Sequence, residues 1–276
     1  MRIVMTDNEV EKYFGLFKKS LYDANEYRHS LVPAKLYKFC PLFKEPTESQ
    51  QRLKCLQENK LWLSTYESLN DPFDLSPFYI DYEKFAQHGY PPETISWFDD
   101  LLKYVSKDNI AICSLTKNTW KSMLMWAHYA NNHRGFCIEY EVLNAQYIWD
   151  VNYATKRLAL ANSPINLLIE TRKGNIDNQY LGLILQQNLV KSIEWEYEHE
   201  YRILQIKADV PKMGMYGGEA DITALGLKVS KIIVGWKCEH YKQLVDIAKS
   251  LGCKISLVEP SKLSFQMEEI HGQTKI

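Results

Sequence analysis

The amino-acid sequence predicts an α+β fold in which a mixed central β-sheet is flanked by helices. Segments with the apolar spacing of amphipathic helices are interspersed with short apolar or alternating segments typical of strands. Near the C-terminus, residues 228–235, 239–250 and 253–258 follow a strand–helix–strand pattern, which normally gives a parallel strand pair through a right-handed crossover. The 276 residues are 46% hydrophobic, which is enough for a substantial core.

A helix is predicted near the N-terminus, over residues 6–22. Thr6 and Glu9 form a capping-box pattern, and the apolar residues that follow recur at helical spacing. We therefore divide the chain into an N-terminal helical extension, residues 1–30, and one α+β domain of catalytic type, residues 31–276.

The remaining elements follow from the same hydrophobic patterns and from turn formers. Besides the C-terminal unit, the predicted strands comprise residues 36–39, 61–64, 110–115, 135–142 and 197–206. The predicted helices comprise residues 48–58, 93–105, 120–130 and 178–193. The loosest segments are residues 23–35, 155–178 and 208–222, and the last contains three glycines and could close over a ligand as a lid.

Composition excludes several classes of protein. The formal net charge of −1 is unlike that of a dedicated nucleic-acid binder, whose domain is usually basic. No apolar run approaches the roughly 20 residues that a membrane span needs, and the first residues do not have the pattern of a signal peptide. The six cysteines include no CxxC pair. We therefore expect a soluble, cytoplasmic protein with reduced thiols and no membrane partner.

The sequence also lacks the motifs of several common enzymes. There is no GxxxxGK[ST] loop, no GxGxxG after a strand, no GxSxG elbow and no HExxH helix. These absences argue against a P-loop NTPase, a Rossmann dehydrogenase, an ordinary α/β-hydrolase and a zincin.

Four segments combine polar groups with aromatic rings, and the first is residues 36–39. It places Lys38 between Tyr37 and Phe39 on a predicted strand. Lysine is rarely buried without a partner, so Lys38 is either a solvated residue of this strand or a cation that holds a phosphate group.

The second segment runs from Ser64, at the end of a predicted strand, into Asn70-Asp71-Pro72. These three residue types in this order are turn formers, and a plain turn explains them. Alternatively, Asn70 and Asp71 shape the rim of a pocket or bind a sugar hydroxyl. Asp71 and Asp74 could also attract a metal ion, for which carboxylates alone are weak evidence.

The third segment, Ser114 followed by residues 123–139, is the densest, and its aromatic and imidazole groups are Trp126, His128, Tyr129 and His133. A strand, a short helix and another strand would bring these side chains together. His128 is either a core histidine with its hydrogen bonds satisfied or part of a functional site, and its aromatic neighbours keep both interpretations open.

The fourth segment, residues 195–202, has the alternation of a strand. In a strand, Glu196, Glu198, Glu200 and Arg202 project to one face, where three carboxylates repel each other unless a cation is near. The segment is therefore either a solvated sheet face closed by a Glu–Arg pair or a place where a carboxylate is kept for chemistry.

Together these segments resemble the bacterial family known as domain of unknown function 2971. The resemblance extends over about residues 36–240. It rests on Leu36-Tyr37-Lys38-Phe39, Trp62-Leu63-Ser64, Asn70-Asp71-Pro72-Phe73, Met125-Trp126-Ala127-His128-Tyr129-Ala130, His133-Arg134-Gly135-Phe136-Cys137-Ile138-Glu139 and Trp195-Glu196-Tyr197-Glu198-His199-Glu200-Tyr201-Arg202.

The order of the segments also resembles that of ADP-ribosyltransferase-type toxins, especially those that act on DNA. This resemblance implies an ADP-ribosyltransferase-like fold with NAD as substrate, Lys38 as the dinucleotide anchor, and Glu198 or Glu200 as the catalytic carboxylate. Lys38 departs from the pattern, because the first strand of those toxins carries Arg or His. His128 is a further catalytic candidate. The expected cofactor-binding residues are Tyr37, Lys38, Ser64, Asn70, Asp71, Trp126, Tyr129, His133 and Arg202.

The leading hypothesis is an NAD-dependent ADP-ribosyltransferase-like enzyme, a bacterial toxin or phage-defence effector that cleaves the nicotinamide–ribose bond. Its acceptor would be nucleic acid, protein or water, and a partner such as an antitoxin protein would fit this role. The second hypothesis is a non-catalytic sensor or interaction module of the same fold. The third is a metal-dependent nuclease that uses Asp71, Asp74 and the glutamate cluster.

Overall fold

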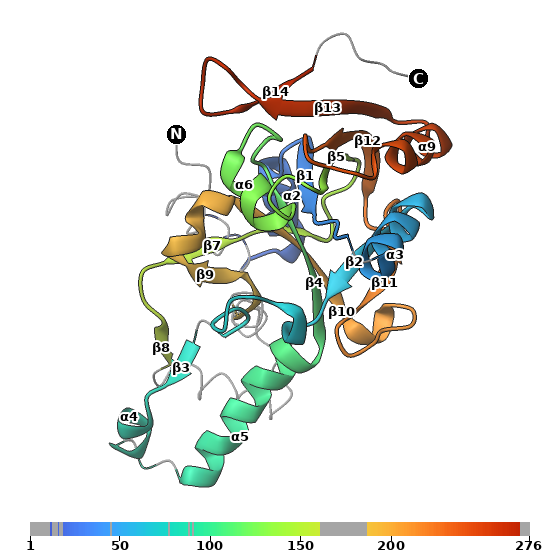
Figure 1. The fold of residues 1–276 in the computed structure, drawn as a ribbon. Helices are drawn as coiled ribbons and strands as arrows, with labels where there is room; N and C mark the ends of the chain where they lie inside the picture. The colour runs from blue at the N-terminus through green and yellow to red at the C-terminus, as the bar shows by residue number, and fades with distance from the viewer. Residues whose placement is uncertain are drawn as a thin grey trace.

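In a computed structural model of the chain, the residues described are 12, 16, 19–44, 46–76, 78–87, 89, 91–160 and 187–270. This part of the chain confirms an α+β fold with a mixed sheet flanked by helices (Figure 1). For the two helices predicted over residues 6–22 and 178–193, most of the residues lie outside the described part of the chain. Within the same residues, none of the helices combines the length and the apolar character that crossing a bilayer demands.

The helices of the described residues surround a set of mostly short strands. The α-helices are α2 (Leu21–Leu31), α3 (Pro46–Gln57), α4 (Tyr82–Gln87), α5 (Pro92–Lys103), α6 (Met123–Tyr129) and α9 (Tyr241–Leu251). The 3-10 helices are η1 (Tyr66–Ser68), η3 (Ile193–Glu198) and η4 (Lys207–Asp209), and η2 (Tyr104–Asp108) is a π-helix. The strands are β1 (Lys35–Cys40), β2 (Lys60–Ser64), β3 (Phe78–Ile80), β4 (Ile110–Thr116), β5 (Phe136–Val142), β6 (Ile148–Asp150), β7 (Asn152–Ala154), β8 (Leu158–Leu160), β9 (Val190–Ser192), β10 (Glu200–Ile206), β11 (Gly217–Asp221), β12 (Leu227–Val234), β13 (Lys254–Pro260) and β14 (Met267–Glu269).

The main sheet divides at β4. One edge of β4 pairs along its whole length with β10, whereas the other edge is shared by two strands. Thr116 pairs with Tyr37 of β1, and Ile112 pairs with Ser64 of β2. Two arms therefore leave the same edge: β1 continues into β5, β12 and β13, and β2 continues into β11. We call the gap between β1 and β2 the fork.

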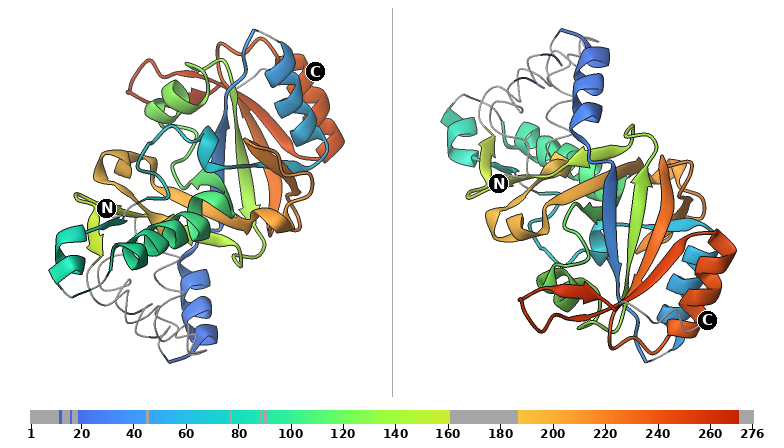
Figure 2. Two further views of the ribbon diagram at one scale, coloured as in Figure 1. Left: turned by 90° about the horizontal axis from the view of Figure 1, so that it is seen from below. Right: turned by 90° about the horizontal axis from the view of Figure 1, so that it is seen from above.

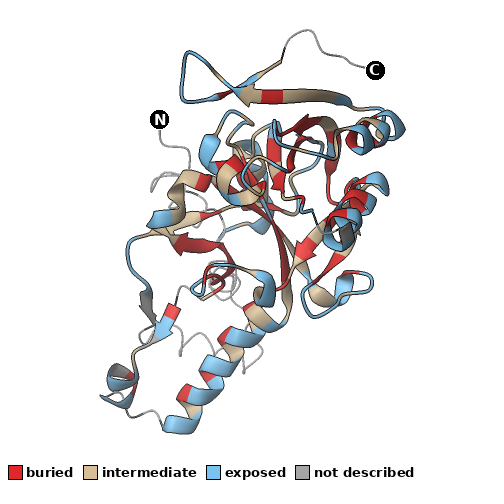
Figure 3. Cartoon of the chain, in the orientation of Figure 1, coloured by how far each residue is buried: buried red, intermediate tan, exposed pale blue. Residues whose placement is uncertain are grey.

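The two faces of the first arm are covered by different elements. Leu36 and Cys40 of β1 belong to a hydrophobic core that includes residues of α3 and α9, whereas Phe39 belongs to a second core with Trp126 of α6. Figure 2 shows α3 and α9 on one side of this arm and α6 on the other. Buried residues gather along β4, β5 and β12, while α4 and α5 are largely exposed (Figure 3).

The C-terminal strand–helix–strand unit is confirmed, because β12 and β13 are parallel neighbours joined by α9. The strands predicted over residues 36–39, 61–64, 110–115 and 135–142 are confirmed as β1, β2, β4 and β5. The helices predicted over 48–58, 93–105 and 120–130 are confirmed as α3, α5 and α6, with shifted ends.

The prediction that residues 23–35 are loose was wrong, because most of them form α2. Helix α2 lacks a pronounced apolar face, and the buried side chain of Arg28 anchors the helix instead. The Arg28 guanidinium donates to the backbone oxygens of Ala145 and Gln146 at 3.1 Å, and it lies over the Trp149 ring at 3.7 Å. These contacts are between distant parts of the chain, so local sequence patterns do not indicate them.

Two other predicted boundaries were wrong. The helix predicted to end at residue 193 gives way to β9 over Val190–Ser192, and the strand predicted from residue 197 begins at Glu200. Residues 193–198 form η3 instead, and His199 then takes a left-handed conformation with φ of 46°. A Ser192 side chain that accepts from the Glu194 backbone N–H caps η3 and explains why the alternating residues start as a helix. In the predicted loose segment 208–222, residues 217–221 form β11.

Gly135 lies where the β5 backbone touches the end of β1. A Cβ atom at this position would overlap the carbonyl oxygen of Cys40. We expect Gly135→Ala to lower the free energy of unfolding by about 1–3 kcal/mol, because main-chain atoms cannot rotate away from the added methyl group. Denaturant unfolding measures this change. Gly214→Ala is the control, since its Cβ would meet its nearest atom at an ordinary 3.4 Å, and equal losses in the two variants would contradict the packing argument.

Candidate functional site

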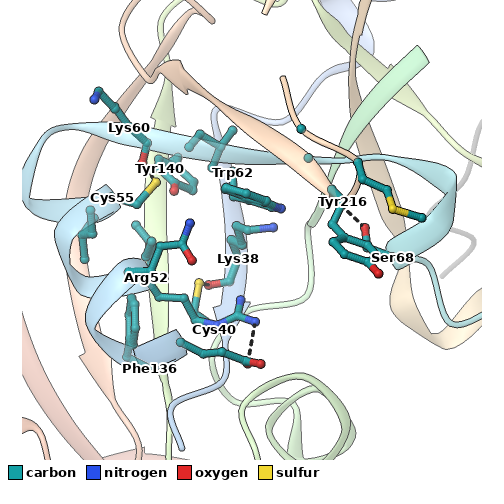
Figure 4. A pocket seen from close by; sticks show the side chains of 18 residues that line it. Lys38, Cys40, Arg52, Cys55, Lys60, Trp62, Ser68, Phe136, Tyr140 and Tyr216 are labelled. Atoms are coloured by element: carbon teal, nitrogen blue, oxygen red, sulfur yellow. Dashed lines mark hydrogen bonds and ion pairs between the residues drawn. The ribbon is translucent and has the colours of Figure 1, made fainter. Parts of the chain in front are cut away.

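A cavity of about 580 Å³ occupies the fork (Figure 4). Lys38 and Cys40 of β1 and three residues of β5 form its floor, α3 forms one wall, and β2 with the turn 214–217 forms the other. The sequence produces this shape because α3 connects β1 to β2, so the helix lies beside the gap that the two strands leave. Ligand pockets commonly have volumes of about 300–1,000 Å³.

Lys38 is the cation at the floor of the cavity. Its Nζ lies 3.4 Å from the backbone oxygen of Ser114, and no ion pair to it exists among the described residues. Burial raises the pKa of the neighbouring Cys40 and Cys113 thiols, so these groups are neutral at pH 7. The ammonium group of Lys38 therefore faces the cavity without a compensating carboxylate.

Two further cations lie at the rim of the cavity, and both have carboxylate partners. Arg52 is 3.9 Å from Glu48, which also lines the cavity. The Lys60 ammonium lies 2.6 Å from a Glu58 oxygen and 3.4 Å from a Glu219 oxygen. Three cations and one carboxylate line the cavity itself, so its wall carries a positive excess.

Aromatic rings provide the apolar part of the wall. The indole of Trp62 lies against Gly217, where any Cβ would overlap the ring nitrogen and the Leu63 carbonyl. Tyr216, in the turn before β11, also lines the cavity, and its exposed side chain lies beside Ser68 at one side of it (Figure 4). The turn is fixed by side chains at the end of β2: the Thr65 hydroxyl donates to the Met215 oxygen at 2.6 Å.

A second set of polar side chains lies around the start of β10, and we call it the buried charge cluster. Arg202 is fully buried; it pairs with Asp74 at 2.8 Å and with Glu200 at 2.8 Å, and it donates to the Asn188 oxygen. Lys191 of β9 pairs with Glu198 at 2.7 Å and with Glu200 at 3.1 Å. The buried charge cluster thus contains three carboxylates and two cations.

The two glutamates of the buried charge cluster differ in acidity. Burial alone would raise the pKa of Glu200, but the Arg202 and Lys191 cations and hydrogen bonds from Arg202 and Ser114 lower that pKa well below its ordinary range. Burial raises the pKa of Glu198 despite Lys191, and the Glu200 carboxylate adds to this increase. The Tyr129 hydroxyl donates to Glu198. Because the cluster has one carboxylate more than it has cations, Glu198 is the member that most readily holds a proton.

The structure brings together Tyr129, Glu198, Glu200 and Arg202, but it separates them from Lys38. Strand register places Tyr37, Thr116 and Glu200 in one row on the same face of the sheet, and Lys38, the next residue, points to the opposite face. Ser114 connects the two sides: its backbone oxygen faces Lys38, its hydroxyl bonds to Glu200, and it is exposed within an otherwise buried strand. Tyr37 itself donates to Glu139 at 3.0 Å.

The predicted aromatic and imidazole residues also separate. Trp126 is fully buried and donates to the Trp120 oxygen at 2.6 Å. His128 is exposed, and its Nδ1 lies 3.1 Å from the Tyr197 hydroxyl. His133 stacks on Trp126 in a turn of left-handed residues, away from the buried charge cluster, and burial lowers its pKa.

The turn interpretation of residues 70–74 agrees with the structure. The Asp71 carboxylate accepts from the Phe73 backbone N–H at 2.9 Å, and Asn70 is exposed. Asp74 instead belongs to the buried charge cluster. Ser64 ends β2 at the fork, where it pairs with Ile112 and Gly217. Within the described residues, no group of three His, Cys, Asp or Glu side chains is arranged to hold a metal ion.

Among the polar and aromatic residues that the arguments above use, sequence reasoning missed several of the cavity wall and one of the buried charge cluster. They are Arg52, Lys60, Trp62, Tyr216 and Lys191. Arg52 and Lys60 lie on elements whose polar residues read as solvated surface, and Lys191 falls in a segment that was predicted to be helical. The position of Trp62 beside Ser64 in a quoted motif was the only available signal.

The different pKa shifts of Glu198 and Glu200 predict opposite dependences of stability on pH. A lowered pKa in the folded state means that Glu200 stabilises the fold above its unfolded pKa of about 4.3 and loses this contribution as the pH falls. A raised pKa means that the contribution of Glu198 is lost as the pH rises through its folded pKa. At pH 7 we expect Glu200→Gln to cost about 3–5 kcal/mol, because Arg202 loses a buried partner, and Glu198→Gln to cost about 1 kcal/mol. Denaturant unfolding between pH 7 and 2 tests this, because the Glu200 contribution is lost only below about pH 4.3; equal costs at pH 7 would contradict it.

Comparison with known proteins covers the part of the chain that carries α6, β5 and most of the buried charge cluster. Residues 125–203 match the model of the family described as "Protein of unknown function (DUF2971)". No curated protein matches the chain, and no solved structure matches it. The match includes Tyr129, Glu198, Glu200 and Arg202, which the motifs had indicated. Over this segment the chain is therefore similar to the DUF2971 family of proteins of unknown function.

Proposed function

We propose that the protein binds a nucleotide in the cavity of the fork. The observation that carries this proposal is an ammonium group, that of Lys38, which has no ion pair among the described residues and lies at the floor of a cavity of about 580 Å³ whose wall contains Trp62 and Tyr216. A phosphate group needs a cation, and a base needs an apolar ring on which to stack.

The arrangement of charges suggests an orientation for the ligand. Arg52 and Lys60 already have carboxylate partners, whereas Lys38 has none among the described residues. A phosphate group therefore gains more binding free energy at Lys38 than at Arg52 or Lys60, where it would have to share the cation with a carboxylate. The base then extends toward Trp62 and Tyr216, between β2 and the mouth of the cavity.

NAD remains the dinucleotide that the sequence resemblance suggests, with Lys38 as its anchor. ADP-ribosyl transfer is the second candidate function, and the position of Ser114 favours it. Ser114 contacts Lys38 through its backbone oxygen and Glu200, on the opposite face of the sheet, through its hydroxyl, so it is the residue that links the cation of the cavity to a carboxylate. In such a reaction the nicotinamide–ribose bond breaks, and a fixed carboxylate stabilises the positive charge that develops on the ribose.

Binding has more support than transfer. Both Glu198 and Glu200 are buried and already engaged by Lys191, and Glu200 is also engaged by Arg202. A carboxylate in two ion pairs has little negative potential left for a sugar cation. The binding function agrees equally with a non-catalytic sensor module, and the toxin or phage-defence role stays a prediction.

Nucleotide binding predicts a rise in melting temperature with AMP and with NAD. At a ligand concentration of about 100 times the dissociation constant, the native state gains about 2.7 kcal/mol. Lys38→Ala should abolish most of this rise, whereas Arg52→Ala and Lys60→Ala should reduce it less, because their charges are already paired. Thermal unfolding with each nucleotide measures the effect.

Lys35→Ala is the matched control, since Lys35 is a lysine of the same strand that pairs with Glu139 outside the cavity. A shift retained in Lys38→Ala and lost in Lys35→Ala would place the ligand elsewhere. No shift with any nucleotide at saturating concentration would refute the proposal.

Transfer predicts that nicotinamide is released from NAD and that Glu198→Gln or Glu200→Gln stops this release. Chromatography of nicotinamide after incubation with NAD measures the turnover. Glu196→Gln is the control, because Glu196 lies in η3 with no ion pair among the described residues. Turnover that survives both buried substitutions in folded protein would exclude this mechanism and leave binding intact.

A further inference from the structure

Three loops meet at the end of the first arm where β1 and β12 finish and β5 begins. They comprise residues 41–44, 131–135 and 235–240, and we call them the loop cluster. The strands bring them together because β5 is antiparallel to both β1 and β12 (Figure 2). Cys40 and Phe136, at the same strand ends, line the nucleotide cavity, so the loop cluster adjoins it.

Backbone contacts fix these loops relative to one another. The Gly235 N–H donates to the Gly135 oxygen at 3.1 Å, and the Lys237 N–H donates to the His133 oxygen at 3.2 Å. The Asn131 amide donates to the Leu42 oxygen at 2.7 Å. A Cβ on Gly235 would overlap the His133 carbonyl, so the backbones touch directly. The loop cluster is a preformed surface.

This surface carries an excess of positive charge. Lys44, Arg134 and Lys237 are exposed and border one shallow depression together with Glu239. None of the three cations has an ion pair within the described residues. The whole chain has a net charge of −1, so a group of three cations with one carboxylate stands out from the rest of the surface.

Two exposed aromatic rings lie among these cations. The Trp236 side chain is 46% exposed and that of Phe43 is 37% exposed. Trp236 is held edge-on by His133, with 6.4 Å between ring centroids, and the Lys237 ammonium lies 4.5 Å from its centroid. These large rings expose apolar surface to water beside the cations. A ligand with planar groups of its own would cover that surface.

We propose that the loop cluster binds single-stranded nucleic acid. Phosphates contact Lys44, Arg134 and Lys237, and unstacked bases lie on Trp236 and Phe43. Proteins that bind single strands combine a cationic path for the backbone with rings on which bases stack. A duplex keeps its bases stacked internally, and an acidic peptide would use the cations but leave the rings uncovered. The site is separate from the nucleotide cavity and does not depend on it.

The test measures the fluorescence anisotropy of a labelled oligothymidylate over a range of NaCl concentrations. We expect binding that weakens with salt, with a log–log slope of about −2, because each neutralised phosphate of a single strand contributes about −0.7. Lys237→Ala should reduce the slope by about 0.7. Trp236→Ala should weaken binding roughly 5- to 100-fold and leave the slope unchanged, and Trp236→Phe should restore part of the affinity.

Matched controls lie on α5, far from the loop cluster. Trp97 is 38% exposed, similar to Trp236, and Lys103 is an exposed lysine. Trp97→Ala and Lys103→Ala should leave affinity and slope unchanged. Because the substituted side chains are exposed, the melting temperature should stay close to that of the wild type, which separates a lost contact from a lost fold.

Four results would overturn the proposal: no binding at low salt, equal affinity for a duplex, equal competition by polyglutamate, or unchanged affinity in Trp236→Ala. A loss of affinity in Lys38→Ala as large as that in Lys237→Ala would place the strand in the nucleotide cavity instead. The AMP-dependent shift in melting temperature measures nucleotide binding independently of the anisotropy experiment. Either proposal can therefore be refuted while the other stands.

Discussion

The guanidinium group of Arg202 compensates buried charge where three separate segments meet. It joins β10 to the turn of residues 70–74 through Asp74 and to residue 188 through a backbone oxygen. Lys191 extends this network to Glu198, and Tyr129 of α6 completes it. Each carboxylate would be costly to bury alone, so the positions of these segments depend on one another. The turn of residues 70–74, β9 and α6 therefore keep their relation to β10 because the charges must remain paired.

This compensation also limits what the fold can do chemically. The carboxylates that a transferase would use hold the structure together, while Lys38, which has no ion pair among the described residues, faces a cavity on the other side of the sheet. Structural and ligand-facing charges are thus divided between the two faces. Ser114 is the point at which they come closest, since it contacts Lys38 through its backbone and Glu200 through its hydroxyl.

The sequence predicted every described strand longer than five residues and four of the six described α-helices, because periodic apolar residues indicate burial, but it missed most of the short strands. It misplaced elements that depend on distant contacts. α2 is held by Arg28 over Trp149, and η3 replaces the predicted strand where the Ser192 side chain accepts from the Glu194 backbone N–H. The site was predicted in part: Glu198, Glu200, Arg202 and Tyr129 do converge. The separation of Lys38 from them was missed, because which face a residue meets depends on register between strands far apart in the chain.

The shared edge of β4 has a mechanical consequence. Each arm is attached to that edge through one registered residue pair, whereas the opposite edge is bound along its whole length by β10. The pairing of β4 with the two arms is therefore sparser than its pairing with β10, although the arms carry the walls of the cavity. No side chain of β4 is among the described residues that line that cavity, so β4 contributes to it by holding the two arms in place.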